Sequence, residues 1–314
     1  MKTTTPVKML VSCLALLTSG RELTAANSSV GMSAARGVAS PFAKHNLHAW
    51  AYEEYDAIKR TPDERAQVLQ DLGITKAGYI CRNAARVAEF EAYVKAYQKA
   101  GIELISVWTP VNTERPLEEI QIRTFLEVAD RHKLKLQWWL TLEEDFDKLP
   151  EGERMERAVA QLRPLVAEAN KRGMKLVIYG HGADEWFTQA ENEIAIAERL
   201  KAEMPSADIG IVYSFHQAFA QMDRFKEVFP RLKPHLAALN LNGNSPKGRP
   251  GVQIGNGDRE QGMIKVVKDS GWHGPVGVLS HVRTTDAKVN LHANLYGLRD
   301  VLKQIGDEAG AASY

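Results

Sequence analysis

Residues 175–182 read K-L-V-I-Y-G-H-G. Three apolar residues, Leu176 to Ile178, are followed by a tyrosine, a glycine, a histidine and a second glycine. A short apolar run that stops at glycines is typical of a buried strand leaving a core. The stretch therefore predicts a strand, and we expect the polar ends of Tyr179 and His181 to lie where the chain turns.

Similar apolar or aromatic segments recur after residue 40, and each is followed by a longer amphipathic, charged segment. Eight such strand–helix units in alternation predict a parallel sheet with crossover helices. Eight is also the number that closes a (β/α)₈ TIM barrel, for which about 270 residues is a typical size. The alternative, an open doubly wound sheet, usually has a phosphate loop after its first strand, and this sequence has none there. Strands are expected at 46–51, 74–80, 103–108, 134–140, 175–180, 209–215, 236–242 and 275–280, and helices at 62–72, 84–100, 117–131, 153–172, 190–203, 219–229, 259–270 and 288–304.

The composition is that of a globular protein with little global charge. Of the 314 residues, 44% are hydrophobic and 25% are charged, and the formal net charge is +1. No overall field therefore attracts nucleic acid or an anionic membrane. We accordingly expect a small-molecule partner and no nucleic acid.

The first residues differ from the rest of the chain. Two lysines precede an apolar run at 9–17, and small residues follow it. This order is typical of a cleavable signal peptide, here 1–26, and the apolar run is too short to be a stable membrane span. It predicts an exported protein, periplasmic or secreted, with lipidation at Cys13 as the second choice. A linker at 27–40, a barrel at 41–306 and a C-terminal tail at 307–314 complete the expected organisation.

Removal of the signal peptide leaves Cys81 as the one cysteine. The expected mature chain then has no intrachain disulfide and no cysteine-based zinc site.

In a TIM barrel the functional side chains lie at the carboxyl ends of the strands. The strand ends of this sequence are rich in aromatic, imidazole and amide groups. Aromatic faces and amide hydrogen bonds suit a sugar ring, which has apolar CH faces and many hydroxyls. The alternative for each aromatic residue is that it fills the barrel core. The expected substrate-binding residues are Asn240, Asn242, His281, Trp50, Trp108 and Trp138.

The second half of the chain resembles the sugar phosphate isomerase/epimerase family, which has a xylose isomerase-like TIM barrel. The resemblance rests on the segments at 175–182, 211–216, 236–243, 253–258 and 271–281, and the last of these, with Gly-Trp-His-Gly-Pro-Val, is the most specific. It implies an enzyme that moves protons on sugars or sugar-like ketones, usually with a divalent metal held by two glutamates, an aspartate and a histidine.

This sequence departs from the family at those ligand positions. The first glutamate position reads Tyr179, and the Asp-x-x-His block reads 213–216, which keeps only His216. The seventh strand offers Asn240 and Asn242, and the closing glutamate falls near Leu279 and Ser280. The cofactor therefore stays unknown, and the family's metal is not expected at these positions.

Imidazoles titrate near neutral pH and can move a proton at carbon. His216 is the first candidate for acid–base catalysis and His181 is the second. Tyr179 can donate a hydrogen bond to a developing enolate oxygen. Such a site would support isomerisation, epimerisation or elimination. Two alternatives stay open: a zinc site made by His181, His216 and His281, and a barrel that binds sugar without catalysis.

Two charged segments follow strand ends. Lys247 and Arg249 could hold a phosphate or an acidic sugar, and the acidic stretch 143–147 could supply carboxylates. Both are more simply interpreted as solvated loops.

Overall fold

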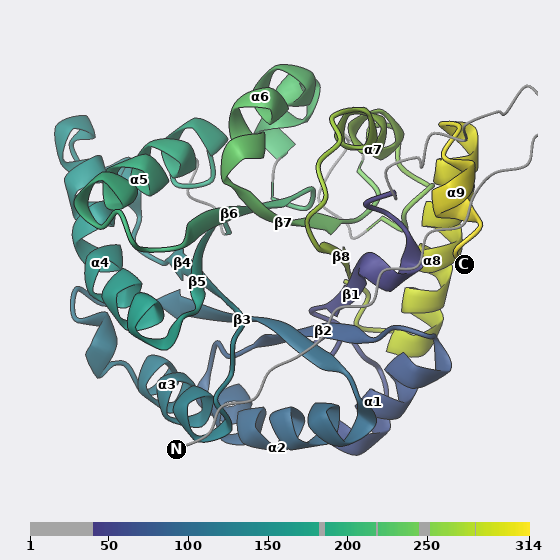
Figure 1. The fold of residues 1–314 in the computed structure, drawn as a ribbon, viewed down its shortest axis with the longest axis horizontal. Helices are drawn as coiled ribbons and strands as arrows, with labels where there is room; N and C mark the ends of the chain where they lie inside the picture. Colours follow the sequence, from purple (N-terminus) through teal and green to yellow (C-terminus); the bar gives the residue numbers. More distant parts are fainter. Residues whose placement is uncertain (1–39, 182–185, 218, 245–251, 280) are drawn as a thin grey trace, which may run out of the picture. The chain divides into compact units, whose positions relative to one another are not determined.

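Eight strands form in the computed structural model, and each pairs in parallel with its neighbour in chain order until the eighth meets the first (Figure 1). The predicted (β/α)₈ barrel is thus confirmed. The structure describes residues 40–181, 186–217, 219–244, 252–279 and 281–314. The strands are β1 (Leu47–Trp50), β2 (Lys76–Ile80), β3 (Glu103–Val111), β4 (Gln137–Leu142), β5 (Lys175–Tyr179), β6 (Ile209–Ser214), β7 (Leu236–Leu241) and β8 (Val276–Leu279).

Helices follow the strands and surround the barrel (Figure 1). Local signals fix their ends: Thr61 and Glu64 form a reciprocal capping box at the start of the first helix, and Gly101 closes the second with φ of 69°. The α-helices are α1 (Pro62–Asp71), α2 (Ala84–Ala100), α3 (Ile120–His132), α4 (Glu151–Arg172), α5 (Ala190–Glu203), α6 (Phe225–Leu232), α7 (Glu260–Asp269), α8 (Ala287–Gln304) and α9 (Glu308–Ala311). Short 3₁₀ turns are η1 (Lys44–Asn46), η2 (Pro116–Glu118), η3 (Phe146–Lys148), η4 (Phe219–Arg224) and η5 (Lys233–His235).

Most strands differ from their expected bounds by one or two residues, and β3 and β4 differ most. Strand β3 continues past Trp108 to Val111, and β4 begins at Gln137 instead of residue 134. The late start of β4 follows from Lys133, which ends α3 in the left-handed conformation. Because β3 continues to Val111, Trp108 lies inside a strand and not at its end.

Side chains alternate between two apolar layers. One layer lies between the strands and the helices, and it contains Trp138 and Phe125. The second is smaller and consists of residues that point into the barrel, among them Trp50, Trp108 and Trp139. Strand residues alternate between the two faces of a sheet, so Trp138 and Trp139 belong to different layers.

The end of the chain packs on the beginning of the described part. Residues 307–314, expected as a tail, include α9 and belong to the same compact unit as the barrel. The Tyr314 hydroxyl donates to the Phe42 carbonyl at 3.0 Å, and the Ser40 hydroxyl donates to an Asp307 carboxylate oxygen at 2.5 Å.

Several sequence-based predictions fall outside the described residues. They concern residues 1–39, with the signal peptide and nearly all of the linker, and also Lys247, Arg249 and Ser280. Among the helices of the described ranges, none combines the length and apolar character that a membrane span needs.

Candidate active site

Three histidines lie at the carboxyl end of the barrel. His181, His216 and His281 each follow the last residue of β5, β6 or β8 by two positions, and each is half-buried. The His216 and His281 ring centroids are 4.3 Å apart, and the rings are inclined by 39°. His281 also interacts electrostatically with His181. Strand ends distant in sequence therefore bring these imidazoles together.

His281 is held as a neutral imidazole. Burial, followed by the positive charges of His216, His181 and Arg283, lowers its pKa from 6.5 to about 3. The ring of Tyr55 contacts it edge-on at 4.5 Å. At neutral pH one of its ring nitrogens can therefore accept a hydrogen bond.

Tyr179 contacts His181, with ring centroids 5.4 Å apart, and forms part of an aromatic floor. Its ring packs edge-on against Trp139 at 5.7 Å, Trp108 at 6.0 Å and Trp50 at 6.2 Å. Burial raises the pKa of its hydroxyl to about 12, while Ser214, Trp50 and Asn240 nearby act in the opposite direction. The phenol therefore keeps its proton near neutral pH. Trp108 connects the floor to the mouth, because its ring lies 4.7 Å from His181.

Asn240 points into the barrel beside His48. A methyl group on Gly277 would overlap the Asn240 Oδ1 atom and lie 2.9 Å from His48 Nε2, so only glycine leaves room for both side chains. Both side chains are fully buried, and neither forms a hydrogen bond of normal geometry with the described residues. Burial lowers the pKa of His48 to about 3, so its ring is neutral.

Asn242 lies next to His281 in a small cavity. Its amide donates to the Gly243 carbonyl at 2.7 Å and to Asn244 Oδ1 at 3.1 Å. The cavity has a volume of about 190 Å³ and is bounded on one side by α8. Asn242 and His281 therefore share one concave surface beside the mouth.

Trp138 is not at the mouth. Its ring packs against Phe125 of α3 at 4.9 Å, and its indole nitrogen donates to Thr109 Oγ1 at 2.8 Å. It therefore lies between the barrel and the helices, and the expectation that it contacts a substrate does not fit this position. Trp50 lines the barrel interior, 4.3 Å from Trp139.

The strand ends do not fit the carboxylate-based metal that the family resemblance implies. The corresponding positions hold a phenol that keeps its proton, Tyr179, and the amide of Asn240, neither of which is the charged oxygen ligand that a hard cation prefers. Within the described ranges, no three or more His, Cys, Asp or Glu side chains group as metal ligands would. His181, His216 and His281 are therefore not arranged as the ligands of a zinc site.

Several carboxylates near the mouth accept hydrogen bonds from backbone amides and do not group as metal ligands. The sequence analysis did not predict them. Glu193 in the first turn of α5 is buried and accepts a hydrogen bond from the Gly180 amide at 2.7 Å. Glu260 accepts from the amides of Gly255 and Gly257 at 3.0 and 2.9 Å. Glu53, just after β1, accepts from the Ile80 amide at 3.0 Å. The one sequence signal for Glu193 and Glu260 is an acidic residue in the first turn of the helix after the strand.

Glu53 makes stability depend on pH. Burial raises the pKa of its carboxyl from 4.5 to about 7. The folded state then binds the proton more tightly than the unfolded state, so stability is highest below 4.5 and falls as pH rises towards 7, by ~3 kcal/mol. We expect Glu53→Gln to abolish this fall and to be the more stable protein at pH 8.

Urea unfolding at pH 5 and pH 8 measures the effect. Glu89→Gln is the matched control, because Glu89 is an exposed partner of Arg86 at 3.3 Å. An unchanged difference between the two pH values in Glu53→Gln would contradict the assignment.

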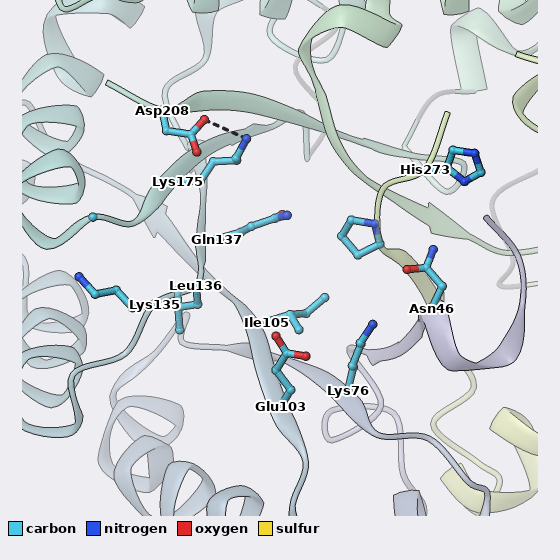
Figure 2. A pocket seen from close by; sticks show the side chains of 12 residues that line it. Asn46, Lys76, Glu103, Ile105, Lys135, Leu136, Gln137, Lys175, Asp208 and His273 are labelled. Atoms are coloured by element: carbon cyan, nitrogen blue, oxygen red, sulfur yellow. Dashed lines mark ion pairs between the residues drawn. The ribbon is translucent and has the colours of Figure 1, made fainter. Parts of the chain in front are cut away.

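A larger cavity lies at the opposite end of the barrel, where the strands begin (Figure 2). Its volume is about 430 Å³, and Lys76, Glu103 and Gln137 project from the starts of β2, β3 and β4. Lys175 pairs with Asp208 at 2.8 Å in its wall. In TIM barrels catalysis is located at the carboxyl ends of the strands, so this cavity is not the candidate active site.

Comparisons with known proteins bear on the fold. No protein-family model matches the chain, and no curated protein matches it by sequence. Solved structures do match it. An L-ribulose 3-epimerase is 10% identical with a TM-score of 0.62, over 85% of this chain and 98% of that one. D-psicose 3-epimerase, solved in the presence of D-fructose, is 14% identical with a TM-score of 0.60, over 83% and 99%.

A third structure, the 3-keto-D-glucoside 4-epimerase YcjR from E. coli, is 14% identical with a TM-score of 0.59, over 82% of this chain and 100% of that one. At these identities the similarity defines the architecture and not the reaction. Together with the closed eight-stranded barrel, it shows that this chain has the xylose isomerase-like TIM-barrel fold.

Proposed function

We propose that this protein is a sugar isomerase or epimerase-like enzyme that transfers a proton next to a carbonyl of a carbohydrate or keto-sugar. The contact between His216 and His281 supports this most directly: the two ring centroids are 4.3 Å apart at the end of the barrel where catalysis is expected, and His181 at the same end contacts the aromatic floor. Such a floor suits the CH face of a sugar, and an imidazole such as that of His216 can transfer a proton at carbon.

In the proposed mechanism His216 removes the proton from the carbon beside the carbonyl. The electrons of that C–H bond form the C=C bond of an enediolate whose oxygen carries the negative charge, and the Tyr179 hydroxyl donates a hydrogen bond to that oxygen. Return of the proton to the opposite face gives an epimer, and return to the neighbouring carbon gives an isomer. Departure of a β-hydroxyl would give elimination. His181, beside Trp108, is the second candidate for proton transfer.

The three similar structures named above support a sugar-modifying reaction, since each is named as a sugar epimerase. Their support is at the level of the fold, so the substrate and the choice among the reactions belong to the proposal. We also propose export, which rests on the signal-like pattern of residues 1–26. Mass spectrometry of protein purified from the periplasm checks it, and an uncleaved chain in the cytoplasm would contradict it.

A barrel that binds sugar without catalysis is the second candidate. The donor set favours it, because Tyr179 and Asn240 are neutral groups that can bind hydroxyls without moving a proton. An enzyme that transfers a proton would exchange carbon-bound hydrogen of the sugar with solvent, whereas a barrel that only binds the sugar would not.

We expect the purified protein to exchange carbon-bound hydrogen of its sugar with solvent. The experiment incubates it in D₂O with D-fructose, D-tagatose, L-ribulose and a 3-keto-glucoside, and follows loss of the C–H signals next to the carbonyl by proton NMR. A chelator is added in a parallel series, where exchange should persist if imidazoles act alone. Binding of a sugar in calorimetry without any exchange would favour the non-catalytic barrel.

A further inference from the structure

A strongly basic pocket lies beside the mouth. Its volume is about 590 Å³, and its walls come from the segments after β1 and β2 and from the segment after β8. Arginine guanidinium groups match carboxylates and phosphates in shape and charge. The basic side chains that line it are Lys59, Arg60, Arg65, Arg82, Arg86 and Arg283.

The positive charge of this pocket is only partly compensated. Six basic groups line it, whereas the carboxylates that line it or pair with its arginines number four, which leaves two positive charges. These two are Lys59 and Arg283, since neither forms an ion pair with the described residues. Both are exposed, so an anion from solvent can reach them. The four carboxylates are Glu54, Asp56, Glu89 and Asp286.

Ion pairs position the remaining guanidinium groups before any ligand arrives. The Glu54 carboxylate forms an ion pair with Arg82 at 2.6 Å. Asp56, whose side chain is 1% exposed, pairs with Arg60 at 2.6 Å and with Arg65 at 3.1 Å. Fixed donors lose little conformational entropy on binding, so their orientation favours affinity.

A row of contacting side chains leads from the pocket to the mouth. The Arg283 guanidinium lies 5.0 Å from the centroid of the Tyr55 ring. Tyr55 contacts His281 at 4.5 Å, and His281 contacts His216 at 4.3 Å. A ligand anchored at Arg283 would thus have its other end near the two imidazoles.

We propose that this pocket binds the oxyanion of an acidic sugar, either a carboxylate or a phosphate, while the uncharged carbons of the sugar reach the histidines. The anion-binding part of the proposal is argued from the charges alone. The placement of the sugar carbons at the histidines rests on the proposed function. The pocket would thereby select anionic over neutral sugars.

Calorimetry with the full-length protein tests the anion site, using D-gluconate, D-glucose 6-phosphate and neutral D-glucose as probes. Both anions should bind at least about tenfold more tightly than glucose, since a charge-assisted hydrogen bond is worth roughly a factor of ten. The double variant Lys59→Gln/Arg283→Gln should lose that advantage. The matched control is Arg123→Gln/Lys226→Gln, two exposed cations on α3 and α6 that should leave affinity within about twofold.

The relative affinity of the two anions identifies the source of the oxyanion. Tighter binding of glucose 6-phosphate indicates phosphate, and tighter binding of gluconate indicates carboxylate. Equal affinity for glucose and both anions, or a double variant that matches its control, would overturn the site. Should the double variant fail to fold, Lys59→Gln alone and the salt dependence of wild-type binding decide, and salt-independent binding would overturn it. Calorimetry measures binding without turnover. If the deuterium exchange fails, the proposed function is refuted, but the anion site can still be tested.

Discussion

His216→Asn should lower the rate of deuterium exchange into the sugar by about 10²–10⁴-fold, the usual effect of losing a general acid–base group. Asparagine keeps a polar side chain of similar reach but does not titrate near neutral pH. The dissociation constant for the sugar should therefore change little, because the aromatic floor of Tyr179 and Trp108 stays in place. NMR gives the exchange rate and calorimetry gives the dissociation constant on the same sample.

His292→Asn is the matched control for this prediction. His292 is an exposed histidine on α8 whose ring lies 4.4 Å from Tyr296, so its loss removes an imidazole without touching the mouth. His281→Asn is the second variant. Normal exchange in His216→Asn with strong loss in His281→Asn would move the catalytic role to His281, whose ring is held neutral. Normal exchange in both would refute imidazole catalysis.

The barrel could be predicted because its signals are local. Each strand is a short apolar run, and several helices have a local cap, such as Thr61 before Pro62 and Asn83 before Ala84. The residues at which strands end were harder to predict. The continuation of β3 to Val111 depends on hydrogen bonds with β4, which do not appear in the sequence of either strand.

The candidate site could be predicted only in outline. His181, His216 and His281 follow strand ends, so a parallel barrel brings them to one face whatever the side-chain details. The face that each tryptophan takes could not be predicted, because a shift of one residue in β4 exchanges the positions of Trp138 and Trp139. The depth of Tyr179 and the raised pKa of Glu53 also depend on burial, which tertiary packing determines.

Trp139→Ala should lower the free energy of unfolding by about 3–5 kcal/mol, as expected for removal of a large buried ring. Trp139 is fully buried, contacts Trp50 at 4.3 Å and Tyr179 at 5.7 Å, and donates from its indole nitrogen to Gln137 at 2.9 Å. The cavity would lie directly under the floor of the mouth. Exchange activity of the folded protein should therefore fall as well, because Tyr179 and Trp50 lose their support. Urea unfolding and the NMR exchange rate at low temperature measure the two effects.

Trp138→Ala separates the loss of stability from the loss of exchange activity, because Trp138 is as buried as Trp139 but faces the helices. Its ring packs on Phe125, and its loss should destabilise the protein by a similar amount, about 3–5 kcal/mol. The mouth keeps Trp139, so the exchange rate of the folded fraction should stay close to wild type. Equal loss of exchange in both variants would mean that activity follows global stability, and the floor would then have no specific role in catalysis.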